Sequence, residues 1–177
     1  MSLIDISERL KSYQSIYNFR DFGGYAGFDG RPVVTGKLFR SAHLNNLGED
    51  DINAIDNLPV GTVVDLRHAP ERARQPSKWP PAPGRALVLT QPVETEREAA
   101  TVAPHEAFTE NELYSADDAR GYMLKSYRSR PHDPGFKALF ADTLRRMTRD
   151  EQTDTPGILV HCAPGKDRTG TLCALIQ

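Results

Sequence analysis

Apolar residues along this chain follow two kinds of spacing. Two short runs, GTVVDLR at 61–67 and PGILVHC at 156–162, are continuously apolar at their centres, which is typical of strands buried on both faces of a parallel sheet. ALVLTQP at 86–92 fits a further strand. Apolar residues at helical spacing predict helices over 47–58 and 132–150. Strands that alternate with helices predict an α/β fold with a central, mostly parallel sheet flanked by helices.

Four other segments give weaker patterns. Residues 5–16 have loose helical spacing and predict a short amphipathic helix or arm, and the Asp29-Gly30 dipeptide predicts a hairpin turn. Residues 117–129 predict another helix. Its larger side chains expected to be buried are Tyr122, Met123 and Tyr127. Residues 91–118 are polar and acidic with little periodicity, and we interpret them as an inserted segment, either a candidate lid over the site or a solvated flap.

Length and charge limit the classes of partner. The chain has 177 residues, of which 38% are hydrophobic, enough for one real core, so we expect a single domain over 1–177. The 22 Lys and Arg residues against 24 Asp and Glu residues give a formal net charge of -2. This near-neutral balance indicates no nucleic-acid or membrane partner. Anion binding must therefore come from a local site.

The cysteines and the N-terminus indicate a location. The chain contains two cysteines, Cys162 and Cys173, too few for a disulfide-built secreted scaffold, and we interpret both as reduced thiols. The first residues, MSLIDISERLKSYQ, lack the apolar core of a signal peptide, and no run is long enough to cross a bilayer. We therefore expect a cytoplasmic protein, while export by a route without such a signal stays open.

The candidate chemistry lies in the loop after the last predicted strand. Cys162 stands at the carboxyl end of that strand, where ligands bind in open α/β sheets. The loop continues to Arg168, and a helix is expected to begin near Thr169. The glycines that permit close backbone approach and unusual dihedrals are Gly165 and Gly170. Such a loop directs backbone N–H groups inward, and Arg168 can hold two oxygens of one phosphate.

The same positive field should act on the thiol of Cys162. A free thiol has a pKa near 8.5, which helix N-termini and cationic neighbours lower to roughly 3.5–7.5. The resulting thiolate would attack phosphorus and form a covalent phosphocysteine intermediate. The hydroxyl of Thr169 could donate a hydrogen bond to the sulfur and help it leave when water hydrolyses the intermediate.

The stretch HCAPGKDRTG at 161–170 resembles the signature of the cysteine-dependent phosphatases. Its GKDRTG ending is similar to bacterial and fungal tyrosine phosphatases with dual-specificity and lipid phosphatase activity. NFRDFGGY, GKLFRSAHL and VVDLRHAPE are similar to the N-terminal half of that family in order and spacing. The resemblance implies a phosphatase-like fold, no metal and no cofactor, and C-terminal helices that this chain lacks. It implies a catalytic role for Cys162, Arg168 and Asp167. The substrate-binding residues would be Ala163, Pro164, Gly165, Lys166, Thr169 and Gly170.

The proton donor for the leaving alcohol is less clearly marked. Many cysteine phosphatases use an aspartate beside Trp-Pro on a separate loop, but here Trp79-Pro80 is followed by Pro81, so Trp79 is interpreted as an ordinary loop or core aromatic. In the resembled family an aspartate at the place of Asp167 is the proposed acid, and a nearby phosphate would raise its pKa as a general acid requires. The alternative is that Asp167 forms a salt bridge to an arginine and braces the loop. The other carboxylates considered are Asp65, expected to bond to backbone or arginine groups, and Asp117 and Asp118, expected to cap a helix.

These residues predict a phosphate monoester hydrolase. Phosphotyrosine in proteins is the first expected substrate, and a phosphoinositide is the second, because Lys166 could contact a second phosphate. The rival is an inactive phosphate-binding module. A thiol redox protein is disfavoured because no second cysteine follows Cys162 closely. His161 has no partner at metal-ligand spacing and is expected to orient the cysteine region through a hydrogen bond.

Overall fold

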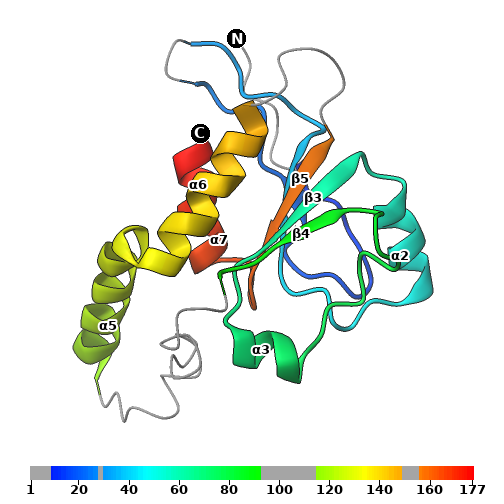
Figure 1. The fold of residues 1–177 in the computed structure, drawn as a ribbon. Coiled ribbons are helices and arrows are strands. Elements are labelled where there is room, and N and C mark those ends of the chain that lie inside the picture. The colour runs from blue at the N-terminus through cyan, green and yellow to red at the C-terminus, as the bar shows by residue number, and fades with distance from the viewer. Residues whose placement is uncertain (1–8, 28–29, 93–114, 149–155) are drawn as a thin grey trace.

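A five-stranded sheet forms the centre of the computed structural model (Figure 1), which describes residues 9–27, 30–92, 115–148 and 156–177. The strands are β1 Arg20–Asp21, β2 Leu38–Ser41, β3 Val60–Asp65, β4 Leu87–Leu89 and β5 Gly157–His161. Their order is β1-β2-β5-β3-β4. The neighbours β2, β5, β3 and β4 are parallel, and β1 is antiparallel to β2. The predicted α/β fold with a mostly parallel sheet is confirmed.

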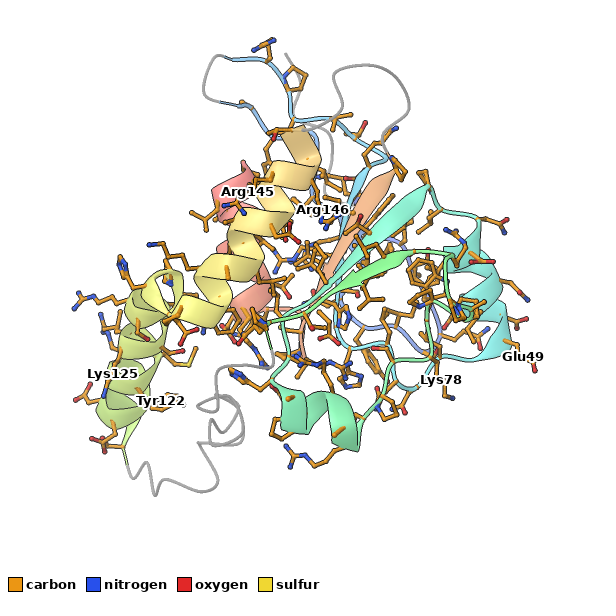
Figure 2. All side chains as sticks on the ribbon, viewed as in Figure 1. Glu49, Lys78, Tyr122, Lys125, Arg145 and Arg146 are labelled. Carbon is orange, nitrogen blue, oxygen red and sulfur yellow. The ribbon has the colours of Figure 1, made fainter. Side chains whose placement is uncertain are left out.

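Helices flank this sheet. They are α2 Glu49–Asp56, α3 Ala69–Arg74, α5 Ala116–Ser129, α6 Pro134–Thr148 and α7 Asp167–Ile176, with a 3-10 turn, η2, at Arg130–His132. In Figure 1, α6 and α7 lie together on one side of the sheet and α2 lies on the other. Figure 2 shows that α5, which carries Tyr122 and Lys125, stands away from the sheet.

The central strand β5 contributes to both faces of the core, and all five of its residues are buried. Successive side chains on a strand point to opposite faces. Ile158 and Val160 accordingly pack in the cluster that includes Phe136 and Leu139 of α6, whereas Leu159 packs on the other face with Phe19, Phe39, Ile55 and Trp79. Trp79 is fully buried there, as expected for a core aromatic.

The strongest helix predictions are confirmed with shorter bounds. The predicted helix over 47–58 is α2 at 49–56, and the one over 132–150 is α6 at 134–148. Asp133 precedes α6 and accepts a hydrogen bond from the N–H of Phe136 at 3.1 Å, so its carboxylate satisfies a backbone donor of the first turn. Around the predicted Asp29-Gly30 turn, Ala26 and Pro32 form an antiparallel bridge and Gly30 has φ 77°, while Asp29 lies outside the described residues.

Several predictions are wrong or lie elsewhere. Of the helix or arm predicted over 5–16, the described part begins at Arg9, which is helical. Leu10 forms an isolated antiparallel bridge with Arg20, and from Lys11 to Ile16 the chain has no regular structure, so this part is an arm. Helix α5 forms as predicted, but none of its residues is buried, because it packs mainly on η2 at one end. The six-residue α3 was not predicted. Most of the candidate lid at 91–118 lies outside the described residues, and its last three residues, 116–118, begin α5.

Candidate active site

The loop between β5 and α7 carries the candidate nucleophile. Cys162 directly follows β5 and is 1% exposed. Helix α7 begins at Asp167, two residues earlier than predicted, so Arg168 already lies in its first turn. Gly165 has φ 68°, and a Cβ atom built there would lie 2.2 Å from the carbonyl oxygen of Ser41. Only glycine fits this close approach to β2 in that left-handed conformation.

The N-terminal half of the chain holds the outside of this loop. Four successive carbonyl oxygens, those of residues 163–166, accept hydrogen bonds from His43, Asn18 and Arg40. The distances are 3.0 Å from His43 N to Ala163 O, 3.1 Å from Asn18 Nδ2 to both Pro164 O and Gly165 O, and 2.8 Å and 3.1 Å from Arg40 Nη2 to Gly165 O and Lys166 O. Since these carbonyls face the protein body, the loop can turn backbone N–H groups to its concave side, as anion-binding loops do.

Arg168 is held in place by Glu71 of α3. Its Nη1 and Nη2 donate to Glu71 Oε2 and Oε1 at 2.6 Å and 2.8 Å, and Nη1 also donates to Leu66 O at 3.2 Å. Both side chains are buried. Burial opposes ionisation of Glu71, but the hydrogen bonds and charge of Arg168 outweigh it, so the pKa of Glu71 lies below its usual range. For the same reason the pKa of Arg168 is raised. The guanidinium is therefore permanently charged and fixed in orientation.

Asp167 lies at the rim of the loop with two donors. Lys166 Nζ donates to Asp167 Oδ1 at 2.6 Å, and the phenolic hydroxyl of Tyr127 donates to the same oxygen. Burial opposes ionisation of Asp167, but these donors outweigh it and hold its pKa below the usual range. The expected arginine partner is replaced by a lysine and a tyrosine. The raised pKa expected beside a phosphate would have to overcome these donors, so it stays a prediction.

The other predicted substrate-binding residues differ in accessibility. The Lys166 side chain is 69% exposed. Thr169 is fully buried, and its hydroxyl oxygen has no hydrogen-bond partner among the described residues. Gly170 lies inside α7, where a Cβ atom would be 3.6 Å from Arg40 Nη2. The unusual dihedral predicted for this glycine is therefore not needed, unlike that of Gly165.

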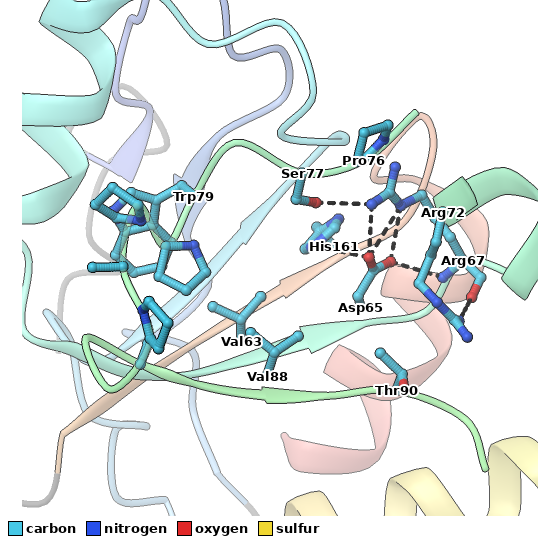
Figure 3. Close-up of a pocket in the computed structure, with 15 residues that line it drawn as sticks. Val63, Asp65, Arg67, Arg72, Pro76, Ser77, Trp79, Val88, Thr90 and His161 are labelled. Atoms are coloured by element: carbon cyan, nitrogen blue, oxygen red, sulfur yellow. Dashed lines mark hydrogen bonds and ion pairs between the residues drawn. The ribbon is translucent and has the colours of Figure 1, made fainter. Parts of the chain in front are cut away.

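Residues on the face of β3 and β5 that lies opposite α6 and α7 form a separate cavity. Adjacent residues on a strand point to opposite faces, so His161 lines this cavity while Cys162 packs against the α6 and α7 side. The cavity, whose lining residues are drawn in Figure 3, has a volume of about 450 Å³. Its lining includes Val63, Val88, Trp79, Asp65, Arg67 and His161. It lies apart from the loop's concave side and is not the candidate catalytic centre.

Asp65 and Asp118 have the structural roles expected of them, and Asp117 lies in the first turn of α5. The carboxylate of Asp65 accepts hydrogen bonds from Arg67 Nε and Nη2 at 2.9 Å and 2.7 Å. Asp118 exchanges hydrogen bonds with Ser115 at the start of α5. The ring nitrogens of His161 have no hydrogen-bond partner among the described residues, and Nε2 lies 3.7 Å from Asp65 Oδ2, a distance that fits an ion pair rather than the predicted hydrogen bond.

Sequence reasoning missed the residues that brace the loop from a distance. The sequence predicts Arg40 and Glu71 only as members of internal ion pairs, with a substrate contact as the alternative for Arg40, and it predicts Tyr127 only as a buried side chain. Arg40 lies in a stretch already noted as similar to the phosphatases, which is the one signal that could have identified it. Within the described ranges, no group of three or more potential metal ligands occurs. No helix in those ranges is both long and apolar enough to span a bilayer.

Comparison with known proteins identifies what the chain is similar to. The sequence model of the tyrosine phosphatase family matches residues 11–177. A protein of Cupriavidus necator whose name places it among the tyrosine-protein phosphatases is 30% identical over 172 residues, covering 93% of this chain and 55% of that protein. The triple specificity protein phosphatase PtpB of Mycobacterium tuberculosis is 30% identical over 174 residues, covering 90% and 60%. The chain thus spans a little more than half the length of these relatives.

Proposed function

The chain belongs to the tyrosine phosphatase family, and from that premise we propose that it is a protein-tyrosine phosphatase that works through a phosphocysteine intermediate on Cys162. The observation that carries the proposal is the pairing of a buried cysteine with a rigidly held guanidinium on one loop. Glu71 uses both carboxylate oxygens on Arg168, which sets the guanidinium plane before any substrate binds.

In the first step, the thiolate of Cys162 attacks phosphorus. The Sγ–P bond forms as the bond to the leaving oxygen breaks, and the carboxyl group of Asp167 gives its proton to that oxygen. Arg168 and the loop N–H groups stabilise charge on the three equatorial oxygens of the transferring phosphoryl group. The products are a phosphocysteine and an alcohol or phenol.

In the second step, water attacks the phosphocysteine. The carboxylate of Asp167 accepts a proton from the water, the Sγ–P bond breaks and inorganic phosphate leaves. The buried hydroxyl of Thr169, with no other partner among the described residues, is suited to donate to the departing sulfur. Residues 163–166 and Gly170 complete the phosphate-binding loop in this proposal.

Phosphotyrosine proteins are the substrates we propose first, with a reducing, cytoplasmic location consistent with two free cysteines. A phosphoinositide or dual-specificity activity is the second candidate, because the exposed side chain of Lys166 stands beside Asp167, where a second phosphate could reach it. An inactive phosphate-binding module is the remaining alternative.

Kinetics on two aryl phosphates tests the chemistry. Phenyl phosphate has a poor leaving group that needs a proton, and p-nitrophenyl phosphate has a good one. We expect Cys162→Ser to lower kcat/KM on both by at least about 10³-fold, with no effect of a metal chelator on the wild type. Asp167→Asn should slow phenyl phosphate about 10²-fold and p-nitrophenyl phosphate much less. Acid quenching of the wild type during turnover should trap phosphate on Cys162.

The same measurements can reject the proposal. If the wild-type protein is folded and binds vanadate but hydrolyses neither ester, the proposal is rejected and the inactive phosphate-binding module is the alternative that remains. Phosphotyrosine, phosphoserine and phosphoinositide substrates compared at equal concentration then decide between the first and second candidates. A preference for the lipid that is lost in Lys166→Ala would favour the phosphoinositide.

A further inference from the structure

The C-terminal end of α5 meets the first turn of α7 at the rim of the phosphate-binding loop. Tyr127, near the end of α5, donates its phenolic hydrogen to Oδ1 of Asp167, the first residue of α7. The two residues are 40 positions apart. This hydrogen bond ties an exposed helix to one carboxyl group of the site, although α5 buries none of its own residues.

A buried arginine fixes the position of the tyrosine ring. Arg130 directly follows α5, is 4% exposed and places its guanidinium carbon 4.9 Å from the centre of the Tyr127 ring. Its Nη1 donates to Thr171 Oγ1 of α7 at 2.9 Å, and its Nη2 donates to Ser126 Oγ of α5 at 2.8 Å. Arg130 therefore joins both helices and supports the ring by a cation–π contact. The phenol has little freedom to leave Asp167.

The second donor to Asp167 constrains the carboxyl group much less. Lys166 is the neighbouring residue, and its side chain is 69% exposed, so solvent screens its ion pair with Asp167. Its flexible four-carbon stem also leaves the ammonium group mobile. Tyr127 has two side-chain torsions and a ring held by Arg130. Of the two donors, the tyrosine is the one that can fix the direction of the carboxyl group.

We propose that Tyr127 is a positioning residue for Asp167, holding Oδ1 so that the other carboxyl oxygen carries the proton toward the leaving group. The proposal rests on the proposed function, in which Asp167 is the general acid. It gives α5 a role in catalysis: the helix delivers the hydroxyl that orients the acid. In this proposal Tyr127 acts through Asp167 and does not contact the phosphate.

The charges around Asp167 define how its titration should respond. The groups that face it are Lys166 on the loop, Tyr127 on α5 and Arg130 in η2, and all three favour the carboxylate. Burial first, and then the bond to Asp167, raise the pKa of Tyr127 to about 12, so the phenol remains a donor at any working pH. Removing the phenolic hydroxyl should therefore raise the pKa of Asp167 while freeing its orientation.

The test is Tyr127→Phe, which removes one hydroxyl from a residue that is 41% exposed. We expect kcat/KM for phenyl phosphate to fall about 10-fold and that for p-nitrophenyl phosphate less than about 2-fold. Inhibition by inorganic phosphate should not change. The alkaline fall of kcat/KM for phenyl phosphate, where the acid loses its proton, should move to higher pH. In the Asp167→Asn background, Tyr127→Phe should have no further effect, because its role passes through that carboxyl group.

Tyr25→Phe is the matched control, since Tyr25 is also 41% exposed and lies on the N-terminal hairpin. Tyr25→Phe should leave kcat/KM for both substrates unchanged, and thermal unfolding of both variants tests that they fold. Equal slowing of both substrates by Tyr127→Phe, or slowing that persists in the Asp167→Asn background, would show a merely structural residue and overturn the proposal. If Asp167→Asn itself slows both substrates equally, the general acid is elsewhere, and the acid assignment and the positioning role fall together, while the Cys162 chemistry stands.

Discussion

Replacing Glu71 by glutamine removes one negative charge from a buried ion pair and keeps the shape of the side chain. Arg168 and Glu71 are 2% and 6% exposed, so solvent screens their interaction little. Glutamine offers one acceptor oxygen where glutamate offers two, and its amide group would face the guanidinium donors at 2.6–2.8 Å. One of the two charge-assisted hydrogen bonds is therefore lost, and the buried guanidinium is no longer neutralised.

The size of the effect follows from these contacts. A hydrogen bond to a charged group contributes about 1.5–3 kcal/mol, and removing a whole partner from a buried pair costs about 3–5 kcal/mol. Glu71→Gln keeps part of the pair, so we expect the free energy of unfolding to fall by about 2–3 kcal/mol. For a chain of this length, Tm should fall by about 5–10 °C. Because the guanidinium loses its fixed orientation, the inhibition constant for inorganic phosphate should rise about 10-fold.

The destabilisation should also depend on pH. Arg168 holds the pKa of Glu71 below its ordinary value of 4.5, and a group whose folded pKa is lowered stabilises the fold above its unfolded pKa. That contribution is present at neutral pH and is lost as pH falls below 4.5 and through the lower folded value. Wild type and Glu71→Gln should therefore differ most near pH 7 and converge in acid.

Thermal unfolding followed by circular dichroism between pH 3.5 and 7 measures both effects. Asp142→Asn is the control, since its ion pair with Arg146 at 3.1 Å is 42% and 37% exposed, and it should cost only about 0.3 kcal/mol. The reasoning is refuted if Glu71→Gln unfolds within about 1 °C of the wild type at pH 7, or if the difference between the two proteins is the same at every pH.

Two further predictions concern the loop and its cysteine. Gly165→Ala should lower kcat/KM by at least about 10²-fold, because the added methyl would lie 2.2 Å from Ser41 O. Gly84 also has a positive φ but lies in open space, so Gly84→Ala should lower the free energy of unfolding by about 1 kcal/mol and leave activity unchanged. Kinetics and unfolding of both variants test this. Iodoacetamide at pH 7 should modify Cys162 and spare Cys173, whose pKa burial raises to about 11; phosphate should protect the reactive site, and peptide mass mapping reads out both. Modification of Cys173 at the same rate would contradict it.

The loop could be predicted from the sequence because its determinants are contiguous. Cys162, Gly165 and Arg168 stand within seven residues of each other, after a run of apolar residues that is typical of a buried strand. Strand end, turn and helix start are all encoded locally, so residue type and spacing identify the anion-binding geometry. The sheet class followed in the same way from the continuous apolar runs of β3 and β5.

The supporting contacts could not be predicted because they depend on tertiary packing. Glu71 lies on α3, a six-residue helix too short and too polar to show a periodic pattern. Helix α5 shows helical spacing, but its apolar residues gave no sign that the helix would stand away from the sheet. The burial predicted for Tyr127 was wrong for that reason, and its hydrogen bond to Asp167 forms only because the fold brings the two residues together.

Three separate elements fix this loop, and each acts on a different part of it. Arg40 of β2 holds two carbonyl oxygens from 125 and 126 residues away, Glu71 of α3 holds Arg168 from 97 residues away, and Tyr127 of α5 holds Asp167. In the proposed function, a loop braced in this way does not need to reorganise when a phosphate binds, so binding energy can be used on the transition state. Because the three contacts act on different groups, their substitutions should have different effects in the proposed reaction. A change at Glu71 should weaken stabilisation of the equatorial phosphate oxygens, and a change at Tyr127 should affect only protonation of the leaving group. Variants in the three elements should therefore differ in kind as well as in size.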